Sequence, residues 1–596
     1  MNASDSCSPL FAGAAALLEK RFAQATSLVS SGNYQQALDI FQELLAACPH
    51  EYTLQNNCAW LFEKLGRYAE AETAYRGLFE EMPGYANGAL GYARMLEQGK
   101  RYVAAVTALR RSVAADPVNP GLLSGLGNAL VMAGEAEAAL LWYGLSVELD
   151  RHARATVSNL LYTLLMVRTI APQVVARELD MCAAVPGLAV RISRVAKQLH
   201  SLSGEFIAGM HRRFEETCRI ETAPAPPLSP GTRKRIRIGY LSADLYAHPV
   251  GYFLEGVIPA HDRNRFEIVV FSLYTERDEL TAALKRSAEH WVVLHGTDRL
   301  EIVRQIRAWQ LDIAVDMAGH TGGNYLDLFA RRLAPLQITW GGYPGSTGLE
   351  SMDHILADQV ALPPEDRPYY TERPLYLPHG YVSFRPPADA PLVGSLPALT
   401  TGCITFGSFN TVQKLNSSTL ALWGAVLRAL PGSRLFLKSK GFDDPLVCSA
   451  FLEKLAAEGV SSDRILLEGY APRRELLAAY HQVDIALDPV PYQGGVTVLE
   501  ALWMGVPTLV LRGKRPPFVR HAESHLTQAG VADWIVASED VYVATALAWG
   551  SNLAGLSTLR SRLRQQMAAS PICDTVAFTR DLEAAFTQVW SERSRH

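Results

Sequence analysis

The sequence predicts two fold classes in one chain, an N-terminal all-helical superhelix followed by two α/β halves of the Rossmann-like kind. A 34-residue period runs through about the first 150 residues, and strand and helix patterns alternate through the C-terminal part. The alternation stops near residue 390 and then starts again. A tandem period of this length is typical of stacked helical repeats, and alternating strands and helices are typical of parallel sheets.

Composition narrows the class of protein. The chain has 596 residues, enough for three or four domains, with 48% hydrophobic and 19% charged residues. A net charge of −4 gives no basic field for nucleic acid. The 8 cysteines contain no CxxC pair, which disfavours a zinc site or a disulfide scaffold. No basic segment precedes the first apolar run and no run is long enough to span a bilayer, so we expect a cytoplasmic protein without membrane contact.

The repeat array occupies residues 1–150. Four positions share the period: Tyr34, Tyr68 and Tyr102; Ala37, Ala71, Ala105 and Ala139; Gly32, Gly66 and Gly134, with Lys100 in the remaining slot; Pro49, Pro83 and Pro117. Glycine suits the turn between two helices, alanine lets them approach, and proline ends the second helix. We predict four tetratricopeptide repeats from about Ala14 to Asp150, the fourth with Ala136 and Arg151 in the tyrosine and proline slots. Such arrays bind proteins or peptides along a concave face.

A connector is predicted over residues 151–232. The sequence here predicts helices but lacks the 34-residue period. The connector ends in a proline-rich linker, Glu221–Thr232.

The first α/β half is predicted over residues 233–390, with strands at 236–241, 266–271, 312–316 and 336–340. Polar residues follow these strands: Asp244 and His248 after the first, His320 after the third, and a glycine-rich loop after the fourth. A histidine at a strand end is more often structural than catalytic, but two at one sheet edge favour a site.

The second half is predicted over residues 391–596, with strands at 404–406, 434–437, 465–467, 484–487 and 508–511. Ligands bind such sheets at the carboxyl ends of the strands, in the cleft between the halves.

The stretch Leu487–Pro507 carries the strongest local signal. A strand end is followed by the turn Gln493-Gly494-Gly495 and then by a helix that Gly505 and Pro507 end. Free N–H groups and the helix dipole suit a phosphate there, and Glu500 lies where a carboxylate reaches a ribose. The alternative is a packed corner that binds nothing. Lys414 precedes another helix and could neutralise a diphosphate, or could be an exposed surface lysine.

These residues in this order resemble the O-linked N-acetylglucosamine transferase (OGT/SPINDLY-like) family, in its bacterial type with N-terminal repeats. The motifs are RRLAPLQITWGGYPGSTG (331–348), FNTVQK (409–414) and GGVTVLEALWMGVP (494–507). The resemblance covers almost the whole chain and implies a GT-B fold, in which two Rossmann-like domains bind a nucleotide-sugar.

The resemblance also implies roles. His248 matches the active-site histidine, Lys414 the lysine on the diphosphate, and Arg520 an arginine after the next strand. The implied nucleotide-sugar contacts are Asn410, Thr411, Ala471, Arg473, Gly494, Gly495, Val496, Thr497 and Glu500. His320 and the loop residues Gly342, Tyr343, Pro344, Gly345 and Thr347 are implied on the sugar and acceptor side, with His320 counted among the catalytic residues.

The expected function is metal-independent, inverting transfer of N-acetylglucosamine from UDP-GlcNAc to Ser or Thr of a protein bound along the array. No Asp-x-Asp occurs in the chain, and no cofactor is expected. Family members often have a Gln-like side chain at Thr411, and some have a His at Leu476. Others carry His-Thr or Thr-Thr at Gly495-Val496. These departures leave O-fucose transfer from GDP-fucose and N-linked hexose transfer open. A non-catalytic scaffold is the third alternative, and the acceptor and oligomeric state stay open.

Overall fold

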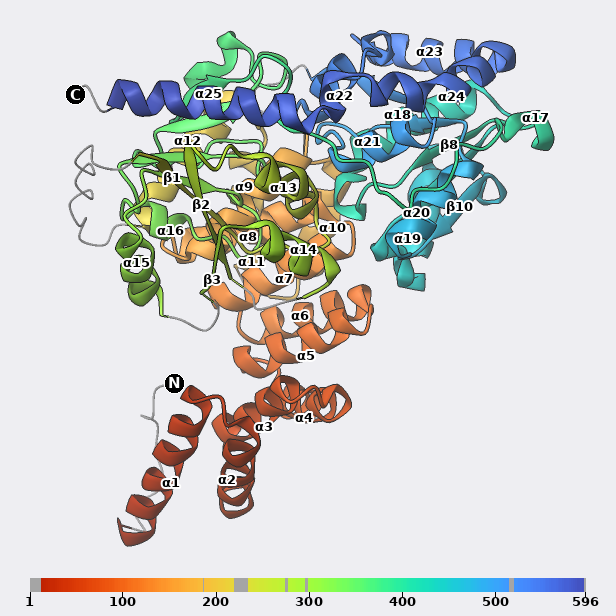
Figure 1. Cartoon of the computed structure of the whole chain (residues 1–596). Coiled ribbons are helices and arrows are strands. Elements are labelled where there is room, and N and C mark those ends of the chain that lie inside the picture. The colour runs from red at the N-terminus through yellow and green to blue at the C-terminus, as the bar shows by residue number, and fades with distance from the viewer. Residues whose placement is uncertain are drawn as a thin grey trace.

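The computed structural model describes residues 12–185, 187–218, 234–273, 277–294, 298–513 and 519–593. A helical array leads into two α/β lobes, and its first helices project away from them (Figure 1). The predicted linker Glu221–Thr232 and residues 1–11 of the N-terminal segment considered for a targeting signal lie outside the described residues.

The array consists of four helix pairs, as the period predicted. Their bounds are α1 (Ala12–Ser30), α2 (Tyr34–Ala47), α3 (Tyr52–Lys64), α4 (Tyr68–Glu81), α5 (Ala86–Gln98), α6 (Tyr102–Ala115), α7 (Pro120–Met132) and α8 (Ala136–Leu149). The turn inside every pair holds one left-handed residue, with φ of 78° at Gly32, 75° at Gly66, 58° at Lys100 and 79° at Gly134. The 34-residue sequence period therefore corresponds to a left-handed backbone conformation that recurs once in each helix pair.

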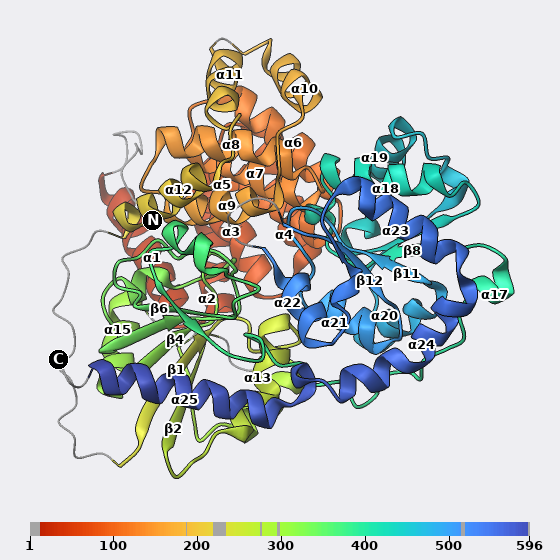
Figure 2. The same cartoon turned by 90° about the horizontal axis from the view of Figure 1, so that it is seen from above.

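The connector is helical, as predicted. It contains α9 (Arg154–Met166), α10 (Pro172–Cys182), α11 (Leu188–Gln198) and α12 (Gly204–Thr217). Array and connector lie over the junction of the two lobes (Figure 2). Asn416 of the second lobe donates to the carbonyl of Met166 at 2.7 Å, and Glu215 accepts from the backbone N–H of Glu350 in the first lobe at 2.7 Å. The connector thus touches both lobes.

The first lobe is a seven-stranded parallel sheet of order β3-β2-β1-β4-β5-β6-β7. The strands are β1 (Ile236–Ser242), β2 (Phe266–Ser272), β3 (His290–Val293), β4 (Ile313–Asp316), β5 (Leu336–Thr339), β6 (His354–Ala357) and β7 (Arg373–Tyr376). The helices are α13 (Pro249–Ala260), α14 (Glu279–Ser287), α15 (Arg299–Ala308), α16 (Leu326–Phe329) and the 3₁₀ helix η1 (Pro364–Tyr369). The four predicted strands are confirmed, and β3, β6 and β7 were missed.

The second lobe is a six-stranded parallel sheet of order β10-β9-β8-β11-β12-β13. The strands are β8 (Thr405–Ser408), β9 (Arg434–Lys438), β10 (Ile465–Glu468), β11 (Ile485–Leu487), β12 (Thr508–Leu511) and β13 (Ile535–Val536). The α-helices are α17 (Ala398–Thr401), α18 (Ser417–Ala429), α19 (Pro445–Ala457), α20 (Arg473–Ala479), α21 (Val496–Trp503), α22 (His521–Gln528), α23 (Glu539–Ser551) and α24 (Leu553–Ala568). Short 3₁₀ helices include η2 (Val412–Lys414) and η3 (Lys440–Asp443). The five predicted strands are confirmed, and the edge strand β13 was missed.

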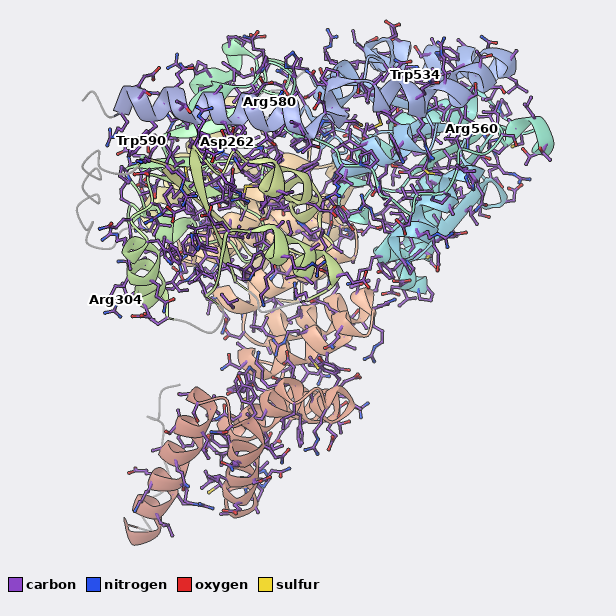
Figure 3. All side chains as sticks on the ribbon, viewed as in Figure 1. Asp262, Arg304, Trp534, Arg560, Arg580 and Trp590 are labelled. Carbon is purple, nitrogen blue, oxygen red and sulfur yellow. The ribbon has the colours of Figure 1, made fainter. Side chains whose placement is uncertain are left out.

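The last helix, α25 (Thr575–Arg593), returns to the first lobe and lies along it (Figures 1 and 2). Its Glu583 accepts from the backbone N–H of Asp262 at 2.8 Å and lies 2.9 Å from Nδ1 of the buried His261. In Figure 3, Asp262 lies just below this helix, which carries Arg580 and Trp590. The prediction that all of residues 391–596 belong to the second half is therefore wrong for α25, whose apolar face covers the first lobe.

Candidate active site

A buried carboxylate holds the turn before α21. Oδ1 of Asp488 accepts from the backbone N–H of Gly494 at 2.8 Å. The Gln493 amide donates to Glu523 at 2.9 Å and to the carbonyl of Leu511 at 3.2 Å. Space beside Gly495 is open, since a Cβ built there meets no atom within 4 Å. The turn therefore presents backbone rather than side chains at the start of a helix, the arrangement that suits an anion.

Lys414 lies against this turn. Its Nζ donates to Oδ1 of Asn410 at 3.1 Å and to the carbonyl of Gln493 at 3.3 Å, and lies 4.5 Å from the centroid of the Tyr492 ring. Oδ1 of Asn410 also accepts from the Thr497 hydroxyl at 3.2 Å. One buried amide oxygen thus joins the lysine to the first turn of α21, and the alternative of an exposed surface lysine is wrong.

Burial perturbs the charges around Lys414. It lowers the pKa of Lys414, and the nearby carboxylate of Asp488 opposes that shift. Burial likewise raises the pKa of Asp488, and the Lys414 ammonium opposes it. Each group therefore makes the charged form of the other less costly. An added phosphate would compete with Asp488 for the same ammonium.

The segment implied for the nucleobase contacts α13, the helix that follows His248. Ala471 is half-buried and lies two residues before Arg473, where α20 begins. Nε of Arg473 donates to Oε1 of Glu500 at 3.0 Å, and its guanidinium carbon lies 3.6 Å from the centroid of the Tyr252 ring on α13. Burial raises the pKa of Glu500 and Arg473 opposes that shift. These contacts bring the two lobes together at the strand ends.

His248 is the residue before α13, with its side chain 33% exposed. The backbone N–H of Val250 approaches its Nδ1 at 3.4 Å, and a carboxylate oxygen of Asp244 lies 3.9 Å from the same nitrogen. Burial lowers the pKa of His248, and Asp244 opposes that shift. The ring is therefore partly accessible and predominantly neutral near pH 7, as a proton acceptor must be.

His320 is a packing residue in this structure. Its ring is 1% exposed, Nδ1 lies 3.1 Å from the Ser158 hydroxyl on α9, and Nε2 lies 3.0 Å from the carbonyl oxygen of Thr347. Burial holds its pKa well below the ordinary value. Both ring nitrogens are engaged inside the protein here, and the catalytic role of His320 stays a prediction.

The loop after β5 is also more structural than expected. Tyr343, Gly345 and Thr347 are buried, and Thr347 N–H donates to Glu372 at 2.6 Å. The Tyr343 hydroxyl lies 2.8 Å from Nε2 of His211 on α12. Tyr343 thus joins the connector to the first lobe, and all three positions are buried. The roles of the half-buried Gly342 and Pro344 stay predictions.

Three further residues hold the site and were not predicted from the sequence. Asp488 and Tyr492 lie in the stretch that was singled out, but a carboxylate and an aromatic ring in a loop carry no local signal of their partners. Tyr252 depends on tertiary contact with Arg473. Nη1 of Arg520 pairs with Asp366 of the first lobe at 2.9 Å. Arg520 thus connects the two lobes. Thr411, also implied as a contact, is exposed, and its side chain does not cap η2.

The ranges that the structure describes lack two kinds of feature. In those ranges, no helix combines the length and apolar character needed to cross a bilayer. Within the same residues, no three or more His, Cys, Asp and Glu side chains gather where a metal ion could be held.

A helical array joined to two parallel-sheet lobes that meet at their strand ends is the architecture of glycosyltransferases of the GT-B class. The tetratricopeptide profile matches residues 22–86, 59–120 and 96–153. The profile of glycosyl transferase family 41 matches residues 222–384 and 395–582. The chain belongs to glycosyl transferase family 41.

Known relatives agree with this assignment. A mutant of the Thermobaculum terrenum O-GlcNAc transferase superposes with a TM-score of 0.80 at 30% identity, covering 91% of this chain and 98% of that one. Proteins described as probable UDP-N-acetylglucosamine–peptide N-acetylglucosaminyltransferase SPINDLY, from Petunia hybrida and Arabidopsis thaliana, are each 35% identical over 366 residues. The matches cover 60% of this chain, but only 39% and 40% of those two relatives.

Proposed function

We propose that this chain transfers N-acetylglucosamine from UDP-GlcNAc to a Ser or Thr hydroxyl of a protein, with inversion and without a metal ion. The observation that carries the proposal is the shared Oδ1 of Asn410, which joins Lys414 to Thr497 at the start of α21. The names of the Thermobaculum and SPINDLY relatives support the donor and the acceptor class. Free thiols at the described cysteines are consistent with a reducing compartment, and we place the enzyme in the cytoplasm.

The donor would lie with its diphosphate on the glycine turn. N–H groups at the start of α21 and the Lys414 ammonium would stabilise the charge that grows on the leaving diphosphate. The backbone at Ala471 and the side chain of Arg473 would contact the base. Glu500 would accept hydrogen bonds from the ribose hydroxyls through Oε2, while Oε1 stays on Arg473.

The reaction needs a proton acceptor on the acceptor side. The acceptor oxygen forms a bond to the anomeric carbon, the bond from that carbon to the diphosphate oxygen breaks, and UDP leaves with the electron pair. The hydroxyl proton passes to a ring nitrogen of His248. The Asp244 carboxylate, 3.9 Å from Nδ1, would stabilise the imidazolium that forms. The helical array would present the polypeptide.

A ligand panel tests the donor. A nucleotide that binds the folded state raises the midpoint of thermal unfolding. We expect UDP and UDP-GlcNAc to protect the chain and GDP and GDP-fucose to have no effect. Protection by GDP-fucose alone would replace the proposal with O-fucose transfer, and protection by none of the four would favour the non-catalytic scaffold.

Intact-mass analysis of co-expressed acceptor proteins then tests the transfer. His248→Ala should bind UDP as the wild type does and lose transfer. If that variant keeps the wild-type rate, a phosphate oxygen of the donor takes the proton and His248 only orients the acceptor.

A further inference from the structure

The third repeat departs from the repeat pattern at one position. Lys100 takes the turn slot that glycine fills in the other three repeats, and its φ is 58°. A residue with a Cβ is strained in this left-handed region, whereas glycine is not. The side chain of Lys100 therefore needs favourable contacts to offset the strain of its backbone.

Those contacts lie in the second lobe. Nζ of Lys100 lies 2.9 Å from Oδ2 of Asp443 in η3 and 6.0 Å from the centroid of the Tyr470 ring. The next residue, Asp444, accepts from the backbone N–H of Val103 in the first turn of α6 at 3.1 Å. The turn and helix of one repeat are thus docked on two consecutive carboxylates.

The other carboxylate oxygen of Asp443 contacts the backbone at Tyr470. Oδ1 accepts from the backbone N–H of Tyr470 at 3.1 Å. A Cβ at Gly469 would lie 1.9 Å from the same oxygen, so only glycine allows this approach. The carboxylate thus holds the backbone of residues 469–470, directly before Ala471 and Arg473. The chain of contacts runs from the array to the segment where we place the nucleobase.

We propose that Lys100 is a positioning residue that couples the third repeat to the nucleobase segment, residues 469–473, through Asp443. The coupling to nucleotide affinity rests on the function proposed above. The ion pair holds Oδ2, which orients Oδ1 toward the Tyr470 N–H and fixes the backbone that would meet the base. Because coupling between two sites is reciprocal, a polypeptide that shifts the third repeat changes nucleotide affinity by the same factor as the nucleotide changes polypeptide affinity.

Lys100→Gly tests the proposal in the full-length chain, because it restores the residue that suits the turn. We expect unchanged or higher thermal stability, UDP binding that is roughly threefold to fivefold weaker by calorimetry, and faster amide exchange confined to residues 469–473. Asp443→Asn should likewise weaken UDP binding and speed amide exchange in this segment. The double variant should bind UDP within about twofold of either single variant.

Arg101→Ala is the matched control, since Arg101 pairs with Glu72 inside the array at 2.5 Å and should leave UDP affinity unchanged. Wild-type exchange and UDP affinity in Lys100→Gly would overturn the proposal. Faster exchange with unchanged UDP affinity would overturn the coupling. If the wild type binds no UDP, the proposed donor is wrong, and the exchange measurement still decides whether Lys100 positions the segment.

Discussion

Lys414→Met separates the charge of the lysine from its packing. Methionine keeps an unbranched stem against the Tyr492 ring but has no ammonium to offer a diphosphate. Burial already makes the charged form of Lys414 costly, and the attraction to Asp488 offsets part of that cost. Asp488 can become neutral by taking up a proton when the ammonium is gone. Methionine also leaves the Gln493 carbonyl without this donor, so the free energy of unfolding should fall by about 1–3 kcal/mol.

The effect on donor binding and transfer should be much larger. A hydrogen bond between charged groups contributes about 1.5–3 kcal/mol, so UDP affinity should fall roughly 10-fold to 150-fold. Charge on the diphosphate increases as the sugar bond breaks. The transfer rate at saturating donor should therefore fall by a further factor on the order of 10²–10³, as when one preorganised donor is removed elsewhere.

Calorimetry with UDP and intact-mass measurement of transfer check both effects. Lys285→Met is the control, because Lys285 is exposed on α14 of the first lobe. A transfer rate within about threefold of the wild type would refute the electrostatic role of Lys414. A loss in Lys414→Met that disappears on correcting for unfolded protein would refute it as well.

Two predictions concern stability. Burial lowers the pKa of His525 to about 3, so below pH 6.5 the unfolded chain binds a proton that the folded chain does not, and stability is lost as the pH falls. Between pH 7 and pH 5, the free energy of unfolding of His525→Leu, measured by urea denaturation, should fall by about 2 kcal/mol less than that of the wild type. Equal decreases in the two proteins would contradict this prediction. Glu137 of α8 accepts from the N–H groups of Ser417 and Ala171, both at 2.9 Å. Glu137→Gln should lower the free energy of unfolding by about 1–3 kcal/mol, whereas Glu148→Gln in the same helix should lower it by less than about 0.5 kcal/mol. Similar values for the two variants would refute the role of Glu137 in holding α8 against the second lobe.

The sequence predicted most strands that are buried on both faces and missed three of the four edge strands. The inner strand β6 was also missed, and the edge strand β10 was predicted. A central parallel strand reads as a continuous apolar run, such as Phe266–Phe271, which is buried throughout. The edge strands β3, β7 and β13 are short or half-buried and have no such run. The same reasoning explains α25, because its sequence shows an amphipathic helix but not which lobe covers its apolar face.

The candidate site was predictable where one stretch of chain forms it. The turn at Gly494-Gly495 and the helix after it were predicted from local spacing, and Lys414 from its place before another helix. The structure joins Lys414 to Thr497 through Asn410. Asp488 was not predictable, because its partners come from a strand end, a turn and a second loop. A carboxylate shows its role only when the fold decides which N–H and which cation it faces.

The glycine-rich loop after β5 shows why a sequence signature can be correct for the family and misleading for the role. Glycines let a backbone approach a ligand, and equally let it approach another backbone. At Gly348, with φ of 75°, a Cβ would lie 1.9 Å from the carbonyl oxygen of His211 on α12. Glycine there allows the connector to pack on the first sheet, beside the buried rings of His320 and Tyr343. Because the same connector touches the second lobe at Asn416, two residues after Lys414, this packing fixes the array relative to both halves of the site.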